Sequence, residues 1–208
     1  MPNPDARRRD AATTRARIID AAIEQLAEGG MRALTHRRVE TRAGVTQGLV
    51  KYHFGSLDGL IEAVVAHMAA VELDAVVRVT PEQYARAQRT GVLPPEIWRA
   101  AEAAWRELTS RPALVRARFE LYLHAVDRPE LQGLIRSQRQ RFLDAAAASL
   151  PEGTPQAGAR LVLALVNGLL LHQLSAPDAD LDADAPGLLL AAGWTAAHLP
   201  NLRDEAPG

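Results

Sequence analysis

Apolar residues recur at three- to four-residue spacing along almost the whole chain, and no other feature constrains the fold as much. This spacing places them on one face of an α-helix, whereas half-buried strands alternate apolar and polar residues. Two clear stripes are Ile18, Ile19, Ala22, Ile23 and Leu26, and Leu60, Ile61, Val64, Val65 and Met68. Strand-like alternation is found nowhere in the sequence. The pattern therefore predicts an all-α fold.

The size and composition fit a globular protein and exclude several other classes. With 208 residues, 48% of them hydrophobic and 24% charged, the chain can bury a core in one or two domains, and wholesale disorder or a fibrous rod does not fit. Because the chain has no cysteine, disulfides, thiolate metal sites and cysteine nucleophiles are excluded. The longest apolar run, residues 161–171, is shorter than the ~20 residues that span a bilayer. We therefore expect a cytoplasmic protein without a membrane segment.

Capping residues, glycines and prolines mark the expected helix ends. The caps expected for the first four helices are Thr13 or Thr14, Thr35, Thr46 and Ser56, and the expected stops are Gly29-Gly30, Gly44 and a point near Tyr52. A capping box with proline at the first helical position, Thr80-Pro81-Glu82-Gln83, predicts another helix start. Further helix-like stretches follow the prolines at positions 95, 112, 129, 155 and 186.

The last part of the chain holds two stretches rich in apolar residues, 159–174 and 188–199. Helices this apolar are buried, either in a core or against a partner chain. Between them, residues 176–185 contain four aspartates at alternate positions: Asp178, Asp180, Asp182 and Asp184. A calcium loop would need a glycine and a distal glutamate that are missing here, so we expect a solvated acidic loop without a metal.

Charge is balanced over the chain but unevenly placed. Residues 1–55 hold 10 Lys+Arg and 6 Asp+Glu, whereas residues 56–208 hold 14 and 19. A basic N-terminal quarter is typical of a small nucleic-acid-binding module, because attraction to phosphate is local. A chance excess of arginines on a solvated face fits the same numbers. Arg7, Arg8 and Arg9 form either an arm toward a duplex or a disordered solubilising tail, and we favour the tail.

Two short helices joined by Ala43-Gly44-Val45-Thr46 are the most informative motif. The glycine permits a tight turn, so that the first helix can lie across a DNA backbone while the second enters the major groove. The sequence from Thr35 to Ser56, THRRVETRAGVTQGLVKYHFGS, resembles the DNA-binding segment of the TetR family of bacterial transcriptional regulators. The resemblance extends over about residues 12–68. It departs from the usual family pattern at Glu40, Lys51 and Leu57, where alanine, tyrosine and lysine are common.

The resemblance implies a homodimeric, ligand-responsive regulator that binds palindromic double-stranded operator DNA, and we expect a repressor rather than an activator. It implies a helix-turn-helix DNA-binding domain over residues 1–55. It also implies a helical domain over residues 56–208 that binds a small-molecule effector and dimerises through its last two long helices. No catalytic residue, metal or cofactor is expected.

The residues expected to contact DNA lie on or beside the third helix and at the start of the second. Gln47 can bond adenine bidentately, Gly48 allows close approach and Leu49 can touch a thymine methyl. Lys51, the only lysine in the chain, suits a phosphate. The full expected set is Thr35, Arg37, Thr46, Gln47, Gly48, Leu49, Lys51, Tyr52 and His53. For His53, a satisfied buried histidine stays open as an alternative.

Effector and dimer contacts are expected in the second domain. The candidate effector residues include two pairs of aromatic side chains at helical spacing, Trp98 with Trp105 and Phe119 with Tyr122. The fifth candidate is the polar residue Asn167. Plain core packing is the alternative for the aromatic residues, and an interface contact is the alternative for Asn167. The candidate dimer-interface residues are Leu161, Leu165, Leu169, His172, Leu189 and Trp194.

A rival hypothesis from a different class is an all-helical small-molecule-binding or enzymatic domain in which the N-terminal helices serve only as a scaffold. It predicts no salt-dependent, sequence-selective DNA binding. The sequence has no phosphate-binding loop, no His-Glu-x-x-His motif and no serine-nucleophile motif, which weighs against an enzyme. A third alternative is a regulator without an effector, which would have no apolar cavity in its second domain.

Overall fold

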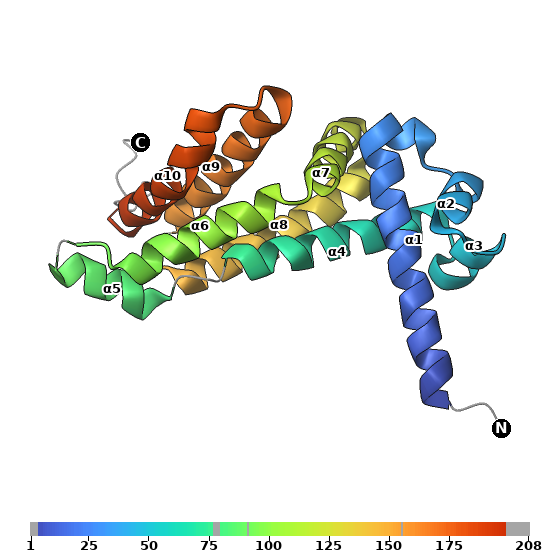
Figure 1. Cartoon of the computed structure of the whole chain (residues 1–208), viewed down its shortest axis with the longest axis horizontal. Helices are drawn as coiled ribbons and strands as arrows, with labels where there is room; N and C mark the ends of the chain where they lie inside the picture. Colours follow the sequence, from blue (N-terminus) through green and yellow to red (C-terminus); the bar gives the residue numbers. More distant parts are fainter. Residues whose placement is uncertain (1–3, 77–79, 91, 155, 199–208) are drawn as a thin grey trace, which may run out of the picture. The chain divides into compact units, whose positions relative to one another are not determined.

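A computed structural model describes residues 4–76, 80–90, 92–154 and 156–198. Over these residues the regular structure is helical throughout, which confirms the predicted fold class. The helices (Figure 1) are α1 (Pro4–Ala33), α2 (His36–Ala43), α3 (Leu49–Phe54), α4 (Leu57–Val76), α5 (Pro81–Thr90), α6 (Pro95–Thr109), α7 (Pro112–His124), the 3-10 turn η1 (Ala125–Asp127), α8 (Pro129–Ser149), α9 (Gln156–Ser175) and α10 (Ala179–Ala197).

The chain packs into two compact units. The N-terminal unit holds the residues up to Met68 together with Ala113–Ile135, and the C-terminal unit holds Ala69–Pro112 together with the residues from Arg136. Helices α4 and α8 each contribute to both units. Packing therefore groups α7 with α1–α3. The boundary expected near residue 55 divides the chain by function and not by packing, and it stays a prediction.

The core of the N-terminal unit is built from the predicted apolar stripes. Every residue of the two stripes is buried. The side chains with almost no exposed surface include Ile18 and Leu26 of α1, Val39 of α2, Val50 of α3, and Leu60 and Val64 of α4. Because each of the four helices supplies at least one of them, their burial holds α2 and α3 in a defined position.

Several predicted caps are confirmed. The hydroxyl of Thr35 accepts a hydrogen bond from the Arg38 amide (3.3 Å), and that of Ser56 accepts one from the Gly59 amide (3.0 Å). Thr80 and Gln83 form the predicted reciprocal capping box, with the Thr80 amide 2.8 Å from the Gln83 side-chain oxygen. Pro95, Pro112 and Pro129 each begin a helix as predicted, whereas position 155 lies outside the described residues. These caps depend on neighbouring residues alone, so a local pattern predicts them.

The prediction for the start of the first helix is wrong. Helix α1 begins at Pro4, and the Thr13 hydroxyl donates to the carbonyl oxygen of Arg9 within the helix instead of capping it. The physical reason is the high helix propensity of the Ala- and Arg-rich segment 6–12. The arginines at positions 7 to 9 therefore belong to a helix and are not part of a disordered tail. The predicted stop is seen as a kink at Gly30, after which α1 continues to Ala33.

Two further boundaries differ from the prediction. Helix α3 begins at Leu49 with Gly48 as its N-cap, so Thr46 is not the cap. Helix α10 begins at Ala179, because the Asp178 side chain accepts hydrogen bonds from the next turn, so the expected acidic loop is mostly helix. Pro186 lies inside α10 and is buried there, which shows tertiary packing overriding the usual helix-breaking preference.

The C-terminal unit is organised around α10, which packs against α9 and α6. Ile97, Ala101 and Leu190 are buried in one cluster together with Ala87 of α5, and Trp194 packs against it. The Trp105 indole Nε1 donates to Oδ1 of Asp182 over 2.7 Å, which links α6 to the first turn of α10. The unit is thus held by both apolar packing and a directed polar contact.

Helix α9 is the one described helix whose length and apolar content would suffice to cross a membrane. The core helix of a soluble protein has the same length and composition. Only 28% of its most apolar window is buried within the single chain. Within the described part of its own chain, α9 leaves Leu161 and Leu171 exposed, while most of its other apolar side chains are half-buried or buried.

Candidate functional site

The helix-turn-helix is formed by α2, the turn at Gly44 and α3. Gly44 adopts a left-handed conformation (φ 61°, ψ 39°), and its amide donates to the carbonyl oxygens at the end of α2. The amide of Val45 donates to the carbonyl oxygen of Glu40 over 3.0 Å. The glycine stop is as predicted, because a side chain is disfavoured in this conformation.

Two arginines of α1 hold the C-terminal ends of the motif's helices. Nη2 of Arg17 donates to the carbonyl oxygens of Ala43 (2.5 Å) and Gly44 (3.2 Å) at the end of α2. Nη1 of Arg15 donates to the carbonyl oxygen of His53 (3.0 Å), and its guanidinium lies 4.4 Å from the centre of the Phe54 ring at the end of α3. Since helix C-termini carry partial negative charge, both cations are favourably placed.

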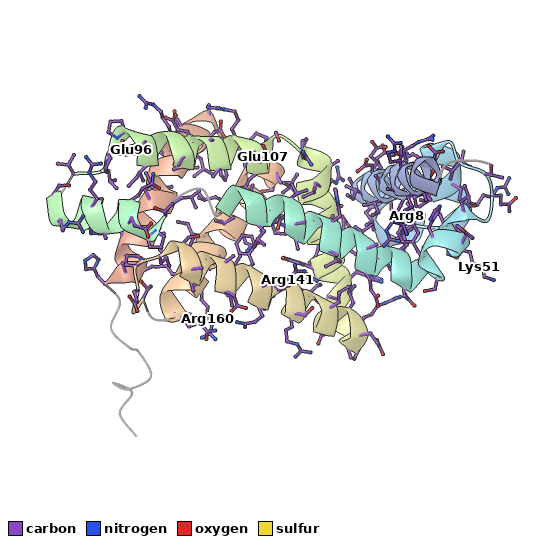
Figure 2. The ribbon with its side chains drawn as sticks, turned by 90° about the horizontal axis from the view of Figure 1, so that it is seen from below. Arg8, Lys51, Glu96, Glu107, Arg141 and Arg160 are labelled. Carbon is purple, nitrogen blue, oxygen red and sulfur yellow. The ribbon has the colours of Figure 1, made fainter. Side chains whose placement is uncertain are left out.

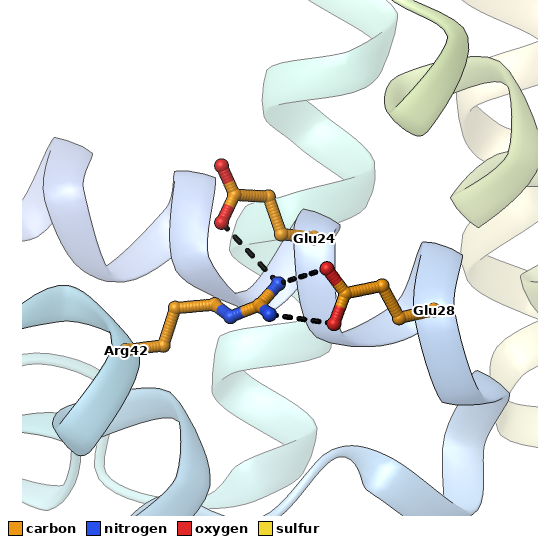
Figure 3. Close-up of polar contacts among 3 residues, drawn as sticks. All are labelled: Glu24, Glu28 and Arg42. Atoms are coloured by element: carbon orange, nitrogen blue, oxygen red, sulfur yellow. Dashed lines mark hydrogen bonds and ion pairs between the residues drawn. The ribbon is translucent and has the colours of Figure 1, made fainter.

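A third arginine joins α2 to α1 at the surface (Figure 3). Arg42 of α2 contacts Glu24 over 3.3 Å and forms two hydrogen bonds with Glu28, of 2.8 and 2.5 Å. The hydrogen bond from Arg42 lowers the pKa of Glu28 from its ordinary value. Because these groups are exposed, their ion pairs contribute little to the stability of the fold.

The outer face of the motif is polar and open to solvent. We define the recognition surface as Thr46, Gln47, Gly48, Lys51 and Tyr52, all of which are exposed. Tyr52 is 80% exposed, a high value for an aromatic side chain, and Figure 2 shows Lys51 extending away from the ribbon. Buried Val50 anchors the opposite side of α3, so the helix has one face in the core and one face available to a partner.

The other predicted DNA contacts lie close to this surface. Leu49 and His53 are half-buried on α3, and the His53 ring meets Tyr52 edge-on with centroids 5.0 Å apart. Thr35 and Arg37 are exposed at the start of α2. The fold therefore collects all nine predicted residues on one helix-turn-helix, while their contacts with DNA stay a prediction.

Sequence reasoning missed the part played by Glu40 in this motif. Its side chain is 4% exposed, and its Oε1 accepts hydrogen bonds from the amides of Gly48 (2.9 Å) and Val50 (3.1 Å). The signal available in the sequence was an acidic residue on the apolar face of α2, followed eight residues later by a glycine at a helix start. Arg15 and Arg17 had no comparable signal, because they reach carbonyl groups 26 to 38 residues away.

The candidate effector residues are divided between the two units. Trp98 and Trp105 lie in the C-terminal unit, whereas Phe119 and Tyr122 lie in the N-terminal unit with ring centroids 6.1 Å apart. Trp105 is buried, and Trp98 is 41% exposed beside Gly187 of α10. The Asn167 amide nitrogen donates to Leu163 within α9, and its buried Oδ1 has no hydrogen-bond partner among the described residues. Effector binding by this set stays a prediction.

The candidate interface residues differ in exposure. Leu161 is 38% exposed, His172 is exposed, and Leu165, Leu189 and Trp194 are half-buried. Leu169 is buried within its own chain. The face of α9 that carries Leu161 and His172 is therefore the one left open for a partner.

We expect Gly44→Ala to lower the free energy of unfolding by about 1–2 kcal/mol, since a side chain disfavours the left-handed conformation. A Cβ there would also lie 3.1 Å from Nη2 of Arg17. Gly44→Asn is the matched variant, because asparagine tolerates this conformation better. Urea unfolding followed by circular dichroism should rank wild type above Asn and Asn above Ala, and an Ala variant as stable as wild type would contradict the prediction.

Comparison with known proteins places these features in a family. Residues 18–64 match the family described as "Bacterial regulatory proteins, tetR family", and residues 97–193 match the family described as "Tetracyclin repressor-like, C-terminal domain". The HTH-type transcriptional regulator BetI of Paraburkholderia xenovorans is 28% identical over 162 residues, which cover 76% of this chain and 80% of BetI. The first match contains the whole of α2, the turn and α3.

Solved structures agree with these matches. A TetR-family member from Streptomyces coelicolor A3 is 26% identical, with a TM-score of 0.57 over 86% of this chain and 97% of that one. The multidrug binding protein EbrR in complex with proflavin is also 26% identical, with a TM-score of 0.57 over 86% and 99%. A transcriptional regulator from Rhodococcus sp. RHA1, at 23% identity and a TM-score of 0.63 over 93% and 99%, shares the fold. The resemblance found in the sequence is thereby confirmed, and the chain belongs to the TetR family of bacterial transcriptional regulators.

Proposed function

We propose that this TetR-family transcriptional regulator is a homodimeric repressor that binds palindromic operator DNA and changes its DNA affinity when an apolar or amphipathic small molecule binds. DNA binding is assigned to residues 1–55, and dimerisation and effector binding to residues 56–208. The observation that carries the proposal is the recognition surface: Gln47, just before α3, and Lys51 and Tyr52, on α3, are exposed, whereas Val50 on the other side of α3 is buried.

Different residues are assigned to base and phosphate contacts. Gln47 and Leu49 are proposed to read base edges, because an amide can bond adenine bidentately and an apolar side chain can meet a thymine methyl. Lys51, Arg37, His53 and the hydroxyl groups of Thr35 and Thr46 are proposed to contact phosphates, and Tyr52 is proposed to contact a base edge or a phosphate. This division predicts which substitutions alter sequence preference and which weaken binding to every sequence.

Homodimerisation is supported by the uncovered surface of the last two helices. On α9, Leu161, Leu171 and His172 are exposed, and Leu165 is half-buried beside them. On α10, Leu188 is 41% exposed. Apolar surface of this kind on long helices is typical of a bundle completed by a second copy. A dimer also explains a palindromic site, since two-fold symmetric heads read two equivalent half-sites about 34–36 Å, or a multiple of that distance, apart.

Effector binding is supported by a structural neighbour that binds a small molecule and by a buried polar atom of α9. EbrR was solved with proflavin bound, at 26% identity to this chain. The unpartnered Oδ1 of Asn167 provides a buried acceptor that an effector or a second subunit would satisfy. An effector that binds better to one separation of the two heads than to another shifts DNA affinity by that difference.

Repression follows from occupancy, because a dimer seated on a promoter excludes other proteins from the same DNA. The proposed partners are thus operator DNA, a small-molecule effector and a second copy of this chain in the cytoplasm, with no membrane, metal or cofactor involved. The rival hypothesis assigns the N-terminal helices to a scaffold and predicts no selection of DNA.

The deciding experiment is selection of genomic DNA fragments by the purified protein, followed by anisotropy titration of the enriched duplex at two salt concentrations. We expect an inverted repeat, and affinity that falls by about 10³-fold or more between about 50 and about 200 mM salt if six or more phosphates are neutralised. Tyr52→Ala should lose the enrichment. Absence of enrichment by wild type at low salt, with and without candidate effectors, would favour the scaffold hypothesis.

Gln47→Ala and Lys51→Ala form a matched pair on one exposed surface. Gln47→Ala is expected to cost about 1–3 kcal/mol on the selected duplex and much less on a scrambled one, because it removes a base contact. Lys51→Ala is expected to weaken both duplexes alike and to reduce the salt dependence by about one phosphate contact. Anisotropy titration of the four protein–DNA pairs measures both effects. Equal losses on the two duplexes for Gln47→Ala would remove Gln47 from base readout.

A further inference from the structure

Glu40 is a buried acidic residue that holds the turn of the helix-turn-helix at two places. Its backbone carbonyl oxygen accepts a hydrogen bond from the Val45 amide (3.0 Å), just after the turn. Its side-chain Oε1 accepts hydrogen bonds from the amides of Gly48 (2.9 Å) and Val50 (3.1 Å), where α3 begins. One residue of α2 therefore spans the connection between the two helices.

Helix α3 has no side-chain cap from its own N-cap residue. That residue is Gly48, which adopts a left-handed conformation (φ 94°, ψ −11°) and makes no side-chain capping bond. The first amides of a helix have no partner within the helix, and in a helix of only six residues they are a large share of the total. The Glu40 side chain supplies from the neighbouring helix the acceptor that Gly48 lacks.

We propose that Glu40 is a positioning residue for base readout: its Oε1 fixes the start of α3 and thereby the direction in which Gln47 and Lys51 meet the DNA. This inference rests on the proposed DNA-reading function of α3. Gly48 lies next to Gln47 in the chain, and Val50 lies next to Lys51, so the two bonded amides are adjacent to the two side chains that Glu40 positions. Because the start of α3 is already fixed in the free protein, no conformational entropy is lost in ordering it when the protein binds DNA.

The same contact limits where phosphates can bind. Helix N-termini attract anions, but the N-terminal amides of α3 already face a carboxylate. Phosphates are therefore expected at the start of α2 and at the side chains of Thr46 and Lys51, rather than at the N-terminal amides of α3. Removing the charge of Glu40 while keeping its acceptor oxygen should leave base discrimination intact and strengthen binding to all duplexes slightly, because one negative charge near the DNA is lost.

Three substitutions separate the hydrogen bonds from the charge and the volume. Glu40→Gln keeps an acceptor oxygen, and both bonds end on a single oxygen in the wild-type protein. Glu40→Met keeps a similar volume without any acceptor. Glu40→Asp keeps the charge but shortens the side chain by one methylene. The readout is the ratio of affinities for the selected duplex and for the same duplex with scrambled half-sites, measured by anisotropy on the full-length protein with its thermal unfolding as a control.

We expect the affinity ratio of Glu40→Gln to stay within about threefold of wild type and that of Glu40→Met to fall by about tenfold or more, the range of one base contact. An unchanged ratio in a folded Glu40→Met variant overturns the proposal, as does an equal loss in Glu40→Gln. If Glu40→Met unfolds, Glu40→Asp decides: a reduced ratio supports positioning and an unchanged ratio overturns it. A wild-type protein that selects no duplex overturns the proposed function itself, whereas the outcomes above leave that function standing.

Amide hydrogen exchange gives a test that needs no DNA and no Glu40→Met variant. The amides of Gly48 and Val50 should be protected in wild type and in Glu40→Gln, with the Gly55 amide, bonded to Lys51 at the other end of α3, as the internal reference. Selective loss of Gly48 and Val50 protection in Glu40→Asp is the expected spectroscopic signature. Rapid exchange of both amides in the wild-type protein would overturn the proposal whatever the DNA titrations show.

Discussion

The double variant Leu161→Asp/Leu171→Asp is expected to be monomeric and to bind the operator about 100-fold more weakly than wild type. Both leucines are exposed on α9, at 38% and 47% of their surface. Two aspartates in an apolar interface would be desolvated without partners, which disfavours association strongly. In a monomer the two DNA-binding domains are no longer linked, so binding of the first does not raise the effective concentration of the second at the DNA. Linkage of two binding modules raises the overall affinity by about 10²–10⁴-fold, and this gain is lost.

Sedimentation velocity and anisotropy titration on the selected duplex measure the two effects separately. Leu123→Asp is the matched control, because Leu123 is a 72% exposed leucine on α7, a helix that carries none of the proposed interface residues. It should leave both the oligomeric state and the operator affinity unchanged. A double variant that sediments as a dimer would refute an interface on α9, and a monomer with full operator affinity would refute the need for two linked heads.

Gly158→Val is expected to lower the free energy of unfolding by about 3 kcal/mol, because α9 and α10 approach too closely there for a side chain. A Cβ on Gly158 would lie 2.7 Å from the carbonyl oxygen of Ala196 and 2.9 Å from its Cβ. The carbonyl belongs to the backbone of α10, so relief requires the two helices to move apart. That movement would also disturb the surface proposed for dimerisation.

Gly133→Ala is the matched control on another helix. Gly133 is exposed in α8, and a Cβ there meets nothing within 4 Å. Alanine should therefore stabilise the protein by about 0.5–1 kcal/mol through helix propensity alone. Urea unfolding of both variants tests the opposite signs. A Gly158→Val protein with wild-type stability would mean that α9 and α10 do not pack as closely as described.

Much of the helix-turn-helix could be predicted from the sequence, because its main determinants are local. The cap at Thr35 and the left-handed Gly44 depend on residues within four positions of each other. The apolar stripes of α1 and α4 depend on periodicity alone, and all their members are buried. The predicted start of α3 at Thr46 was wrong for a physical reason. The acceptor for the amides at the start of α3 is the side chain of Glu40 on another helix, and not the local candidate Thr46.

The all-α class and the buried faces of the N-terminal helices could be predicted from the sequence, because both follow from periodicity and short-range spacing, and the family could be predicted from the resemblance of residues 35–56 to its DNA-binding segment. The charged residues that organise the motif could not be predicted in this way, because Arg15, Arg17 and Glu40 bind backbone groups that lie far along the chain or on another helix. The position of Pro186 inside α10 could not be predicted either, because packing of α10 against α6 and α9 outweighs the local preference of proline. The apolar composition of α9 predicted burial, but the division between Leu169, covered by its own chain, and Leu161, left exposed, depends on where α10 packs.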